Sequence, residues 1–484
     1  MSASISASAV NLMTQGRRGG WRRILHAATG LTLLCTQWTC AQNQVHQNPD
    51  LQALKDKLQH LEQEMQELKG EIYAVEEAQP NPLATAAAEL VSPPPTPTEN
   101  EKASTEQEQF EGKIDLYGFV MLDSGYDFKT NNPNWFDVVR PTQLPAYAGE
   151  YAPDGKVYYG VRQTRFGVKT LTPTKFGDLK TQFEFELFGT GVDAGQTTFR
   201  LRHAYGELGQ FGAGQTWSAF MDIDVFPNTI EYWGPNGMVF YRNVQFRWLP
   251  VRRGGLQLTF AAERPGASAD QGIYADRIEL KNVTPKFDLP DFSGHMRMTR
   301  EWGYIQTSGI FRKISWVDTG TGPYKLSGTA YGWGVNVTSN LRFGDKDVAR
   351  LAVVYGDGIE NYMNDAPVDI GIKNNFGNPL TPVKGVALPV LGVVSFLDHT
   401  WNQRFTSSAG FSIVNITNSD AQDNSAFHRG YYSVANLLYH PLPRVMMGGE
   451  FQFGRRENAS DGFSSSDYRL QFSFKYDWSK AFAY

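Results

Sequence analysis

The chain has 484 residues, of which 41% are hydrophobic and 13% aromatic, with 47 glycines and a formal net charge of −5. This length is sufficient for a large closed structure with an accessory segment. The aromatic and glycine content favours β structure. The excess of acidic residues argues against a general nucleic-acid binder.

The first 41 residues predict a cleaved export signal. Four arginines precede the apolar stretch "ILHAATGLTLL", which is too short to span a bilayer as a helix. Cleavage after Ala41 fits a small-residue site, and Cys35 and Cys40 both lie before it. The mature chain then has no cysteine, which excludes a disulfide scaffold, a cysteine nucleophile and a thiolate metal site. Loss of the four arginines changes the formal charge from −5 to −9.

Residues 47–78 predict a short coiled coil. Apolar residues alternate at spacings of three and four and are flanked by Lys, Glu and Gln, as in a heptad repeat. They are Leu51, Leu54, Leu58, Leu61, Met65, Leu68, Ile72 and Val75. The alternative is one amphipathic helix packed on its own domain. We expect oligomerisation through this segment, which the spacing does not by itself resolve into a dimer or a trimer.

Residues 79–111 predict a linker. The stretch "QPNPLATAAAELVSPPPTPTENEKAS" is rich in Pro, Ala, Glu, Ser and Thr, and such a composition buries almost no apolar surface. No secondary structure is expected there.

Residues 112–484 predict a 16-stranded antiparallel transmembrane β-barrel, which makes the fold class all-β. Runs such as "KTQFEFELF", "GEFQFG" and "YRLQFSFKYDW" place aromatic or aliphatic residues on one face and polar residues on the other. About sixteen runs are joined alternately by seven short turns and eight longer connections, as in outer-membrane barrels. Because single strand boundaries are imprecise, 14- and 18-stranded barrels are alternatives.

The expected connections follow from the turn residues in the sequence. Short turns are predicted at "TPTKFG", "ELGQFG", "PVRRGG", "REWG", "FGDKD", "HTWNQ" and "HPLPR". Longer connections are predicted near residues 129–156, 190–196, 219–237, 265–292, 318–325, 359–384, 418–426 and 457–467.

Tryptophans near the strand ends predict interfacial girdles on the outer face of the barrel. The candidates are Trp248, Trp302, Trp316 and Trp478.

No motif indicates an enzyme. The sequence has no G-x-S-x-G elbow, no H-E-x-x-H and no P-loop. The stretch "MDIDVFPNTIE" has two aspartates spaced as in a calcium loop, but it lacks the third ligand and the turn glycine. We therefore expect no catalytic residue, no metal and no cofactor.

The third long connection predicts a constriction inside the barrel. Ala219 to Gly237, "AFMDIDVFPNTIEYWGPNG", mixes aromatic, proline and acidic residues, unlike a loop that is only solvated. We expect it to fold inward, with Asp222, Asp224 and Glu231 as pore-lining acids. The alternative is a loop on the outer surface or in a subunit contact.

Alternation along neighbouring strands predicts charged side chains that face the lumen. Because Phe166, Val168, Phe183, Phe185, Phe199, Leu201, Val244, Phe246 and Trp248 share the apolar face, their neighbours face inward. These inward residues are Arg165, Lys169, Glu184, Glu186, Arg200, Arg202 and Arg247, whereas the same rule places Arg242 outward near the loop end of its strand, unless a bulge resets the alternation. They form either a cationic ladder opposite the acidic loop, which would orient anionic solutes, or structural ion pairs with Glu184 and Glu186.

Several runs resemble the DcaP-like family of Gram-negative outer-membrane porins. They are "LYGFVMLDSGYDF", "RQTRFGVKT", "FRLRHAYGELGQFGAGQTWSAFMD" and "EYWGPNGMVFYRNVQFRW", and the similarity covers most of residues 112–478. The resemblance implies a homotrimer of sixteen-stranded barrels with periplasmic N-terminal coiled coils. It also implies passive uptake of small organic anions such as dicarboxylates and phthalate-like acids. The role of inward basic residues at the constriction carries over to Arg165, Arg200, Arg202 and Arg247.

The sequence thus predicts a trimeric porin in the Gram-negative outer membrane, in contact with lipid and small organic anions. Its channel would be passive and anion-preferring. One alternative is a structural envelope tether whose pore is incidental. Another is a porin with a preference for sugars or phosphate.

Overall fold

The computed structural model describes residues 60, 63, 112–266 and 277–484. The predicted signal peptide, coiled coil and linker lie outside the described residues, apart from His60 and Gln63. Contacts divide the chain into Met1–Thr105 and Glu106–Tyr484. Apart from residues 60 and 63, all described residues belong to the second unit.

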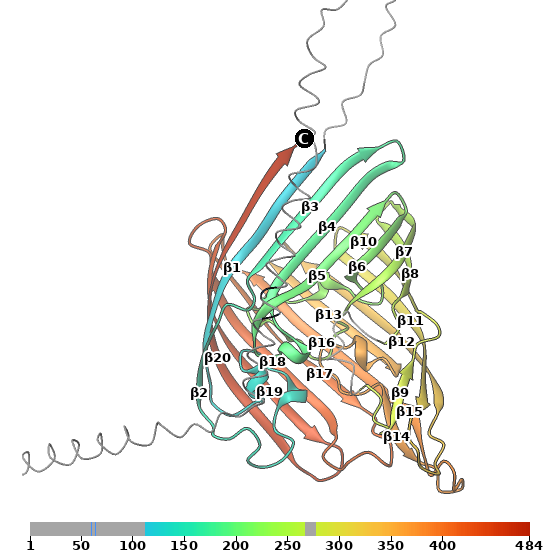
Figure 1. Cartoon of the computed structure of the whole chain (residues 1–484). Coiled ribbons are helices and arrows are strands. Elements are labelled where there is room, and N and C mark those ends of the chain that lie inside the picture. The colour runs from blue at the N-terminus through green and yellow to red at the C-terminus, as the bar shows by residue number, and fades with distance from the viewer. Residues whose placement is uncertain (1–59, 61–62, 64–111, 267–276) are drawn as a thin grey trace, which may run out of the picture. The chain divides into compact units, whose positions relative to one another are not determined.

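Strands make up most of this unit (Figure 1). The first ten are β1 (Lys113–Asp127), β2 (Lys156–Gly160), β3 (Arg165–Thr174), β4 (Gly177–Phe188), β5 (Thr197–Leu208), β6 (Phe211–Trp217), β7 (Arg242–Arg253), β8 (Leu256–Glu263), β9 (Val283–Lys286) and β10 (Asp291–Arg300). The others are β11 (Gly303–Asp318), β12 (Gly328–Phe343), β13 (Asp347–Asp357), β14 (Ile370–Asn374), β15 (Val383–Ala387), β16 (Pro389–Thr400), β17 (Phe405–Ile416), β18 (Phe427–Tyr439), β19 (Val445–Asn458) and β20 (Ser464–Ala483).

Within residues 112–266 and 277–484, the helices are short 3-10 turns in the connections. They are Pro133–Trp135, Pro141–Gln143, Gly191–Asp193, Ile223–Val225 and Glu360–Tyr362. None of the helices in the described residues has the length and apolar character needed to cross a membrane.

The sheet closes into a barrel of sixteen antiparallel strands, as predicted. β1 pairs with β20 along its whole length and with β2 and β3 on its other side. Since β2 and β3 follow one another along β1, they form one interrupted strand. β9 and β10 likewise follow one another along β11 and form a second interrupted strand. The eighteen strands of the sheet therefore act as sixteen, and β14 and β15 form a separate hairpin.

Short turns of two to five residues alternate with longer segments, as predicted, except that the β19–β20 connection (residues 459–463), expected to be long, is no longer than the β18–β19 turn (residues 440–444). The β7–β8 turn shows why glycine is found in the short turns. Gly254 and Gly255 both have positive φ, 60° and 74°, the conformation of a tight hairpin turn whose twist matches the strands. Long connections at one end and short turns at the other are typical of outer-membrane barrels.

Each strand presents one apolar face to the outside of the barrel. On β4, Phe183 is 49% exposed, while the neighbouring Glu184 and Glu186 are buried on the other face. Leu470, Phe472 and Phe474 repeat this arrangement on β20, where they alternate with buried polar residues. The exposed apolar face is the one that meets lipid in a membrane barrel.

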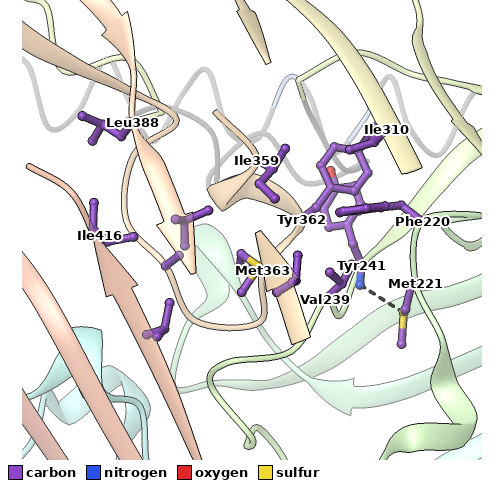
Figure 2. Packing of buried hydrophobic residues seen from close by; sticks show 14 of the residues in the cluster. Phe220, Met221, Val239, Tyr241, Ile310, Ile359, Tyr362, Met363, Leu388 and Ile416 are labelled. Atoms are coloured by element: carbon purple, nitrogen blue, oxygen red, sulfur yellow. Dashed lines mark hydrogen bonds between the residues drawn. The ribbon is translucent and has the colours of Figure 1, made fainter. Parts of the chain in front are cut away.

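The interior of the barrel holds an apolar core, which differs from the wide aqueous lumen expected from the strand number. Figure 2 shows the cluster, in which Phe220 and Val239 pack with Ile359 and Tyr362. Inward residues of β11, β13, β16 and β17 complete it, among them Ile310. The cluster forms because residues 218–241 and 358–388 both fold inward and bury apolar side chains against each other and the wall.

Three of the four predicted girdle tryptophans do lie at the outer surface or a turn. Trp248 and Trp302 are exposed, and Trp478 stacks on the outward Phe166 at 5.6 Å. The prediction for Trp316 is wrong, since this side chain is buried. It packs on Ile370 of the β14–β15 hairpin, and its indole N–H donates to Leu326 O at 2.7 Å. The inserted hairpin gives this inward position an apolar partner.

Candidate functional site

Residues 218–241, the β6–β7 connection, cross the interior of the barrel. At one end, Ser308 and Asn336 on the inner faces of β11 and β12 donate to the carbonyl of Phe220. Further along, the backbone N–H groups of Ile230 and Glu231 donate to Glu450 on β19 at 2.9 and 3.0 Å. Because these strands lie on different sides of the barrel, the loop spans its interior.

The loop backbone lies directly against the wall at Gly237. A Cβ atom at this position would stand 2.3 Å from the carbonyl oxygen of Ile413 and 2.7 Å from that of Val393. Gly392 on β16 faces it, and a Cβ there would meet the Gly237 oxygen at 2.2 Å. Only glycine permits this approach of backbone to backbone.

Asp222 anchors the loop and is not a pore-lining side chain. It is buried and accepts hydrogen bonds from the Tyr304 hydroxyl at 2.7 Å and the Thr338 hydroxyl at 2.5 Å. Burial raises the pKa of this carboxyl, and the two hydroxyl donors oppose that rise. Asp224 remains half exposed and pairs with Arg297 of β10 at 2.6 Å.

Glu231 is also a buried anchor. Its carboxylate accepts from the backbone N–H groups of Val139 at 3.0 Å and Gly234 at 2.5 Å, and from the Tyr432 hydroxyl at 3.0 Å. Burial raises the pKa of Glu231 to about 7, although the backbone donors lower it. The side chain therefore joins the β1–β2 and β6–β7 connections to β18.

A β-bulge on β5 brings two polar side chains to the interior. The register changes so that His203 faces Glu184 while Leu201 faces Phe185, which leaves Arg202 as the extra residue. Both Arg202 and His203 are buried, and Phe199 and Leu201 remain exposed outside. The bulge places Arg202 next to its carboxylate partners.

Four arginines surround two glutamates on the inner face of β3, β4, β5 and the start of β7. Arg202 lies 2.5 Å from Glu184 and 2.7 Å from Glu186. Arg165 pairs with the same two carboxylates at 3.6 and 3.2 Å. The other two arginines, Arg200 and Arg242, each lie 3.8 Å from Glu186. The cluster therefore contains more cationic than anionic groups.

Arg242 occupies the interior, so its predicted outward position is wrong. It stands at the end of β7, where the chain enters the inserted loop, and its guanidinium lies over the Trp217 ring at 5.0 Å. Strand alternation fails at this position because the long side chain turns toward Glu186, which is fully buried.

A cavity of about 780 Å³ lies beside this cluster. Five arginines line it, with one acidic residue, Asp193, among the described residues of its wall. The arginines are Arg140, Arg200, Arg242, Arg277 and Arg456. Aromatic side chains complete the wall, among them Trp135, Tyr232, Trp233, Phe240, Tyr241 and Phe427. Cationic and aromatic groups together suit an organic anion better than a cation or a sugar.

Several of these guanidinium groups keep N–H donors without a protein partner in the described part of the chain. The Nη1 atoms of Arg200 and Arg242 are buried and form no hydrogen bond there. Arg277 donates to Ala366 O at 2.9 Å, and Arg456 donates to Ser425 O at 2.8 Å, so both charges meet carbonyl groups. Arg140 differs, since it pairs with Asp365 at 2.9 Å.

Arg140 lies against two indole rings that contact each other edge to face, with 4.7 Å between their centres. Its guanidinium carbon lies 4.1 Å from the ring centre of Trp135 and 4.3 Å from that of Trp233. Burial lowers the pKa of Arg140, and Asp365 opposes this effect. The aromatic stack and the ion pair position one planar cation at the cavity wall.

Two predicted residues face the interior away from this cluster. The Lys169 ammonium lies 5.0 Å from the Tyr117 ring. Arg247 donates to Gln245 at 2.9 Å and to the carbonyl of Trp217. The structure thus brings together Arg165, Glu184, Glu186, Arg200 and Arg202, but not Lys169, Arg247 or the three loop acids.

Of the five cavity arginines only Arg200 was predicted to face the lumen, and besides Arg242 three others were not identified from the sequence. Arg456 lies on β19 and alternates with the outward Phe451 and Phe453, so strand alternation could have identified it. Arg140 and Arg277 lie in connections, where no periodic signal exists.

The chain matches the model of the DcaP outer membrane protein family over residues 38–340. The outer membrane channel DcaP of Acinetobacter baumannii has a similar structure, with a TM-score of 0.62 and 19% identity. That likeness covers 76% of this chain and 97% of the other. An anion-selective porin from Comamonas acidovorans aligns with a TM-score of 0.47 and 11% identity, over 76% and 100% of the two chains.

No curated protein matches the sequence. The match to the family model extends over more than half of the chain and includes the loop and the arginine cluster described above. Its members are outer-membrane channel proteins and not enzymes. The chain therefore belongs to the DcaP outer membrane protein family.

Proposed function

We propose that this porin conducts small organic anions of the dicarboxylate or aromatic acid class by passive diffusion. The observation that carries the proposal is the cavity lined by five arginines and one aspartate. The Nη1 atoms of Arg200 and Arg242, which form no hydrogen bond within the described part of the chain, provide donors for a carboxylate.

Selectivity in this proposal arises from local charge and not from the charge of the whole chain. The side chains of the loop residues Asp222 and Glu231 are buried, and their carboxylates accept hydrogen bonds from protein groups. Neither carboxylate therefore faces open space. The arginines therefore set the field in the cavity, and a field of one sign in a confined space raises the local concentration of counter-ions. The aromatic wall offers an apolar surface for the organic part of the solute.

The homotrimer and the periplasmic coiled coil form part of the same proposal. The heptad spacing of residues 47–78 supports an oligomeric helix, and the short-turn end of a barrel faces the periplasm. Deletion of residues 47–78 should lower the fraction of trimer in native mass spectra while leaving the single-channel conductance unchanged.

Reversal potentials in planar bilayers test the channel function. In a KCl gradient, the wild type should show anion preference, and Arg200→Gln combined with Arg242→Gln should reduce it. Arg253→Gln combined with Arg404→Gln removes the same charge at the short-turn end and serves as the control. A cation-selective wild type, or an equal effect of both double variants, would contradict the proposal.

A further inference from the structure

A second cavity lies on the outer wall of the barrel, away from the channel. Its volume is about 430 Å³, and it runs over β17, β18 and β19. The floor is formed by Ser433 on β18, between Phe411 of β17 and Phe453 of β19, which are its register partners. A small residue between two phenylalanines leaves a groove one strand wide.

The groove opens on the lipid side of the barrel. Phe411, Leu437 and Phe451 are exposed, while the alternating residues Ser412, Val434 and Gln452 are buried inside. Ala435 and Phe451 are paired and continue the same outer face toward the short-turn end. Phe411, Ile413 and Phe453 thus form the apolar part of the groove, and apolar side chains on the same face continue from it toward the short-turn end, where an acyl chain can follow them.

Two arginines stand on the outer face at the long-loop end of the groove. Arg455 pairs in register with Tyr431, and Arg429 pairs with Glu457 in the next outward row. Their side chains are 42% and 38% exposed. Diagonal neighbours on a sheet face lie roughly 7–8 Å apart, so one phosphate can contact both. The one carboxylate beside them in the described residues is Glu457, which lies 3.1 Å from Arg455 and 3.9 Å from Arg429, so the group keeps one positive charge in excess.

We propose that this groove binds a phosphorylated, acylated glycolipid of the outer leaflet. An acyl chain would lie over Ser433 between Phe411 and Phe453, and a headgroup phosphate would accept hydrogen bonds from Arg429 and Arg455. Long loops face the cell exterior in outer-membrane barrels, so the arginines stand at the level of the outer-leaflet headgroups.

A second copy of the chain fits this surface less well. The outer wall of a barrel is convex, and another convex wall cannot fill a groove one strand wide. Charged residues are also depleted from the core of protein interfaces. The pairing of an apolar groove with two cations at one end matches the amphipathic chemistry of a single lipid molecule.

Native mass spectrometry of the full-length protein in detergent with EDTA tests this proposal. The probe is bisphosphorylated hexa-acylated lipid A, compared with the same lipid after enzymatic dephosphorylation. The wild type should retain the phosphorylated form about tenfold better. Equal retention of the two lipids would overturn the proposal without reference to any variant.

Two variants separate the headgroup from the acyl chain. Arg429→Gln with Arg455→Gln should remove the preference for phosphate, and Ser433→Phe should weaken both lipids by filling the groove. The matched controls are Arg253→Gln with Arg404→Gln for charge, and Thr307→Phe for bulk at an exposed site on β11. Lipid binding that is unchanged in both test variants would contradict the proposed lipid site. A changed oligomeric state with unchanged lipid binding would instead identify a second copy as the occupant.

Discussion

Arg202 and Glu186 form a buried ion pair across β4 and β5, with 2.7 Å between Nη1 of Arg202 and Oε2 of Glu186. Arg202 is 4% exposed and Glu186 is fully buried. Arg200, two residues earlier, stands 3.8 Å from the same carboxylate and lines the cavity. The two neighbouring arginines therefore have different surroundings: Arg202 is paired within the wall, and Arg200 faces the cavity.

This difference predicts that substitution of Arg202 mainly lowers stability, whereas substitution of Arg200 mainly changes ion selectivity. Arg202→Gln leaves two buried carboxylates with less compensation, so we expect a loss of about 3 kcal/mol of unfolding free energy. Arg200→Gln should cost about 1 kcal/mol or less and should shift the reversal potential toward zero. Guanidinium unfolding in detergent and bilayer recordings measure the two effects. The assignment would be wrong if Arg200→Gln were the more destabilising change.

Strand positions in this cluster could be predicted because a barrel wall has only two faces. Phe183 and Phe185 mark the lipid side, and alternation then sends Glu184 and Glu186 inward. The rule failed at Arg242, where the strand passes into a loop, and it gave no sign of the bulge at Arg202.

The contacts of the inserted loops could not be predicted in the same way. Asp222 and Glu231 were expected to line the pore, whereas their actual partners, Tyr304 and Tyr432, lie 82 and 201 residues further along the chain. Such partners depend on where each loop packs in three dimensions. Alternation contains no information about this packing, and it also does not show that apolar side chains fill part of the interior.

Gly237 offers a test of the loop position. Gly237→Ala places a Cβ 2.3 Å from the Ile413 oxygen, and since both atoms belong to backbone, the loop must move away from the wall. We expect a changed single-channel conductance and more current fluctuations. Gly377→Ala is the control, because a Cβ there meets nothing within 4 Å. Identical conductance of the two variants would count against a loop held by this contact.

The buried carboxyl of Glu231 predicts a pH dependence of loop packing. Its pKa is raised from 4.5 to about 7 by burial. Because burial raises the pKa of Glu231 only in the folded protein, the protonated carboxyl contributes its full stabilisation of the fold below pH 4.5. This contribution decreases between pH 4.5 and about 7, as the buried carboxyl ionises, and does not change further at higher pH.

We expect more open-channel current fluctuations at pH 8 than at pH 5 in the wild type. Glu231→Gln stays neutral at both values and should lose this difference. Asp224→Asn, on the same loop but half exposed, should retain it. A pH difference of equal size in Glu231→Gln would exclude Glu231 as its source.

Arg455 and Arg456 are adjacent in sequence and lie on opposite faces of β19. Arg456 lines the cavity and donates to Thr142 O at 3.1 Å and Ser425 O at 2.8 Å, while Arg455 lies on the outer wall beside Glu457. Arg456→Gln should lower anion preference in a KCl gradient, because it removes a cavity charge that forms no ion pair with a carboxylate in the described residues. Arg455→Gln removes the same charge from the lipid side and should leave the reversal potential unchanged. An equal shift in both variants would mean that selectivity follows the total charge of the barrel and not the charge of the cavity.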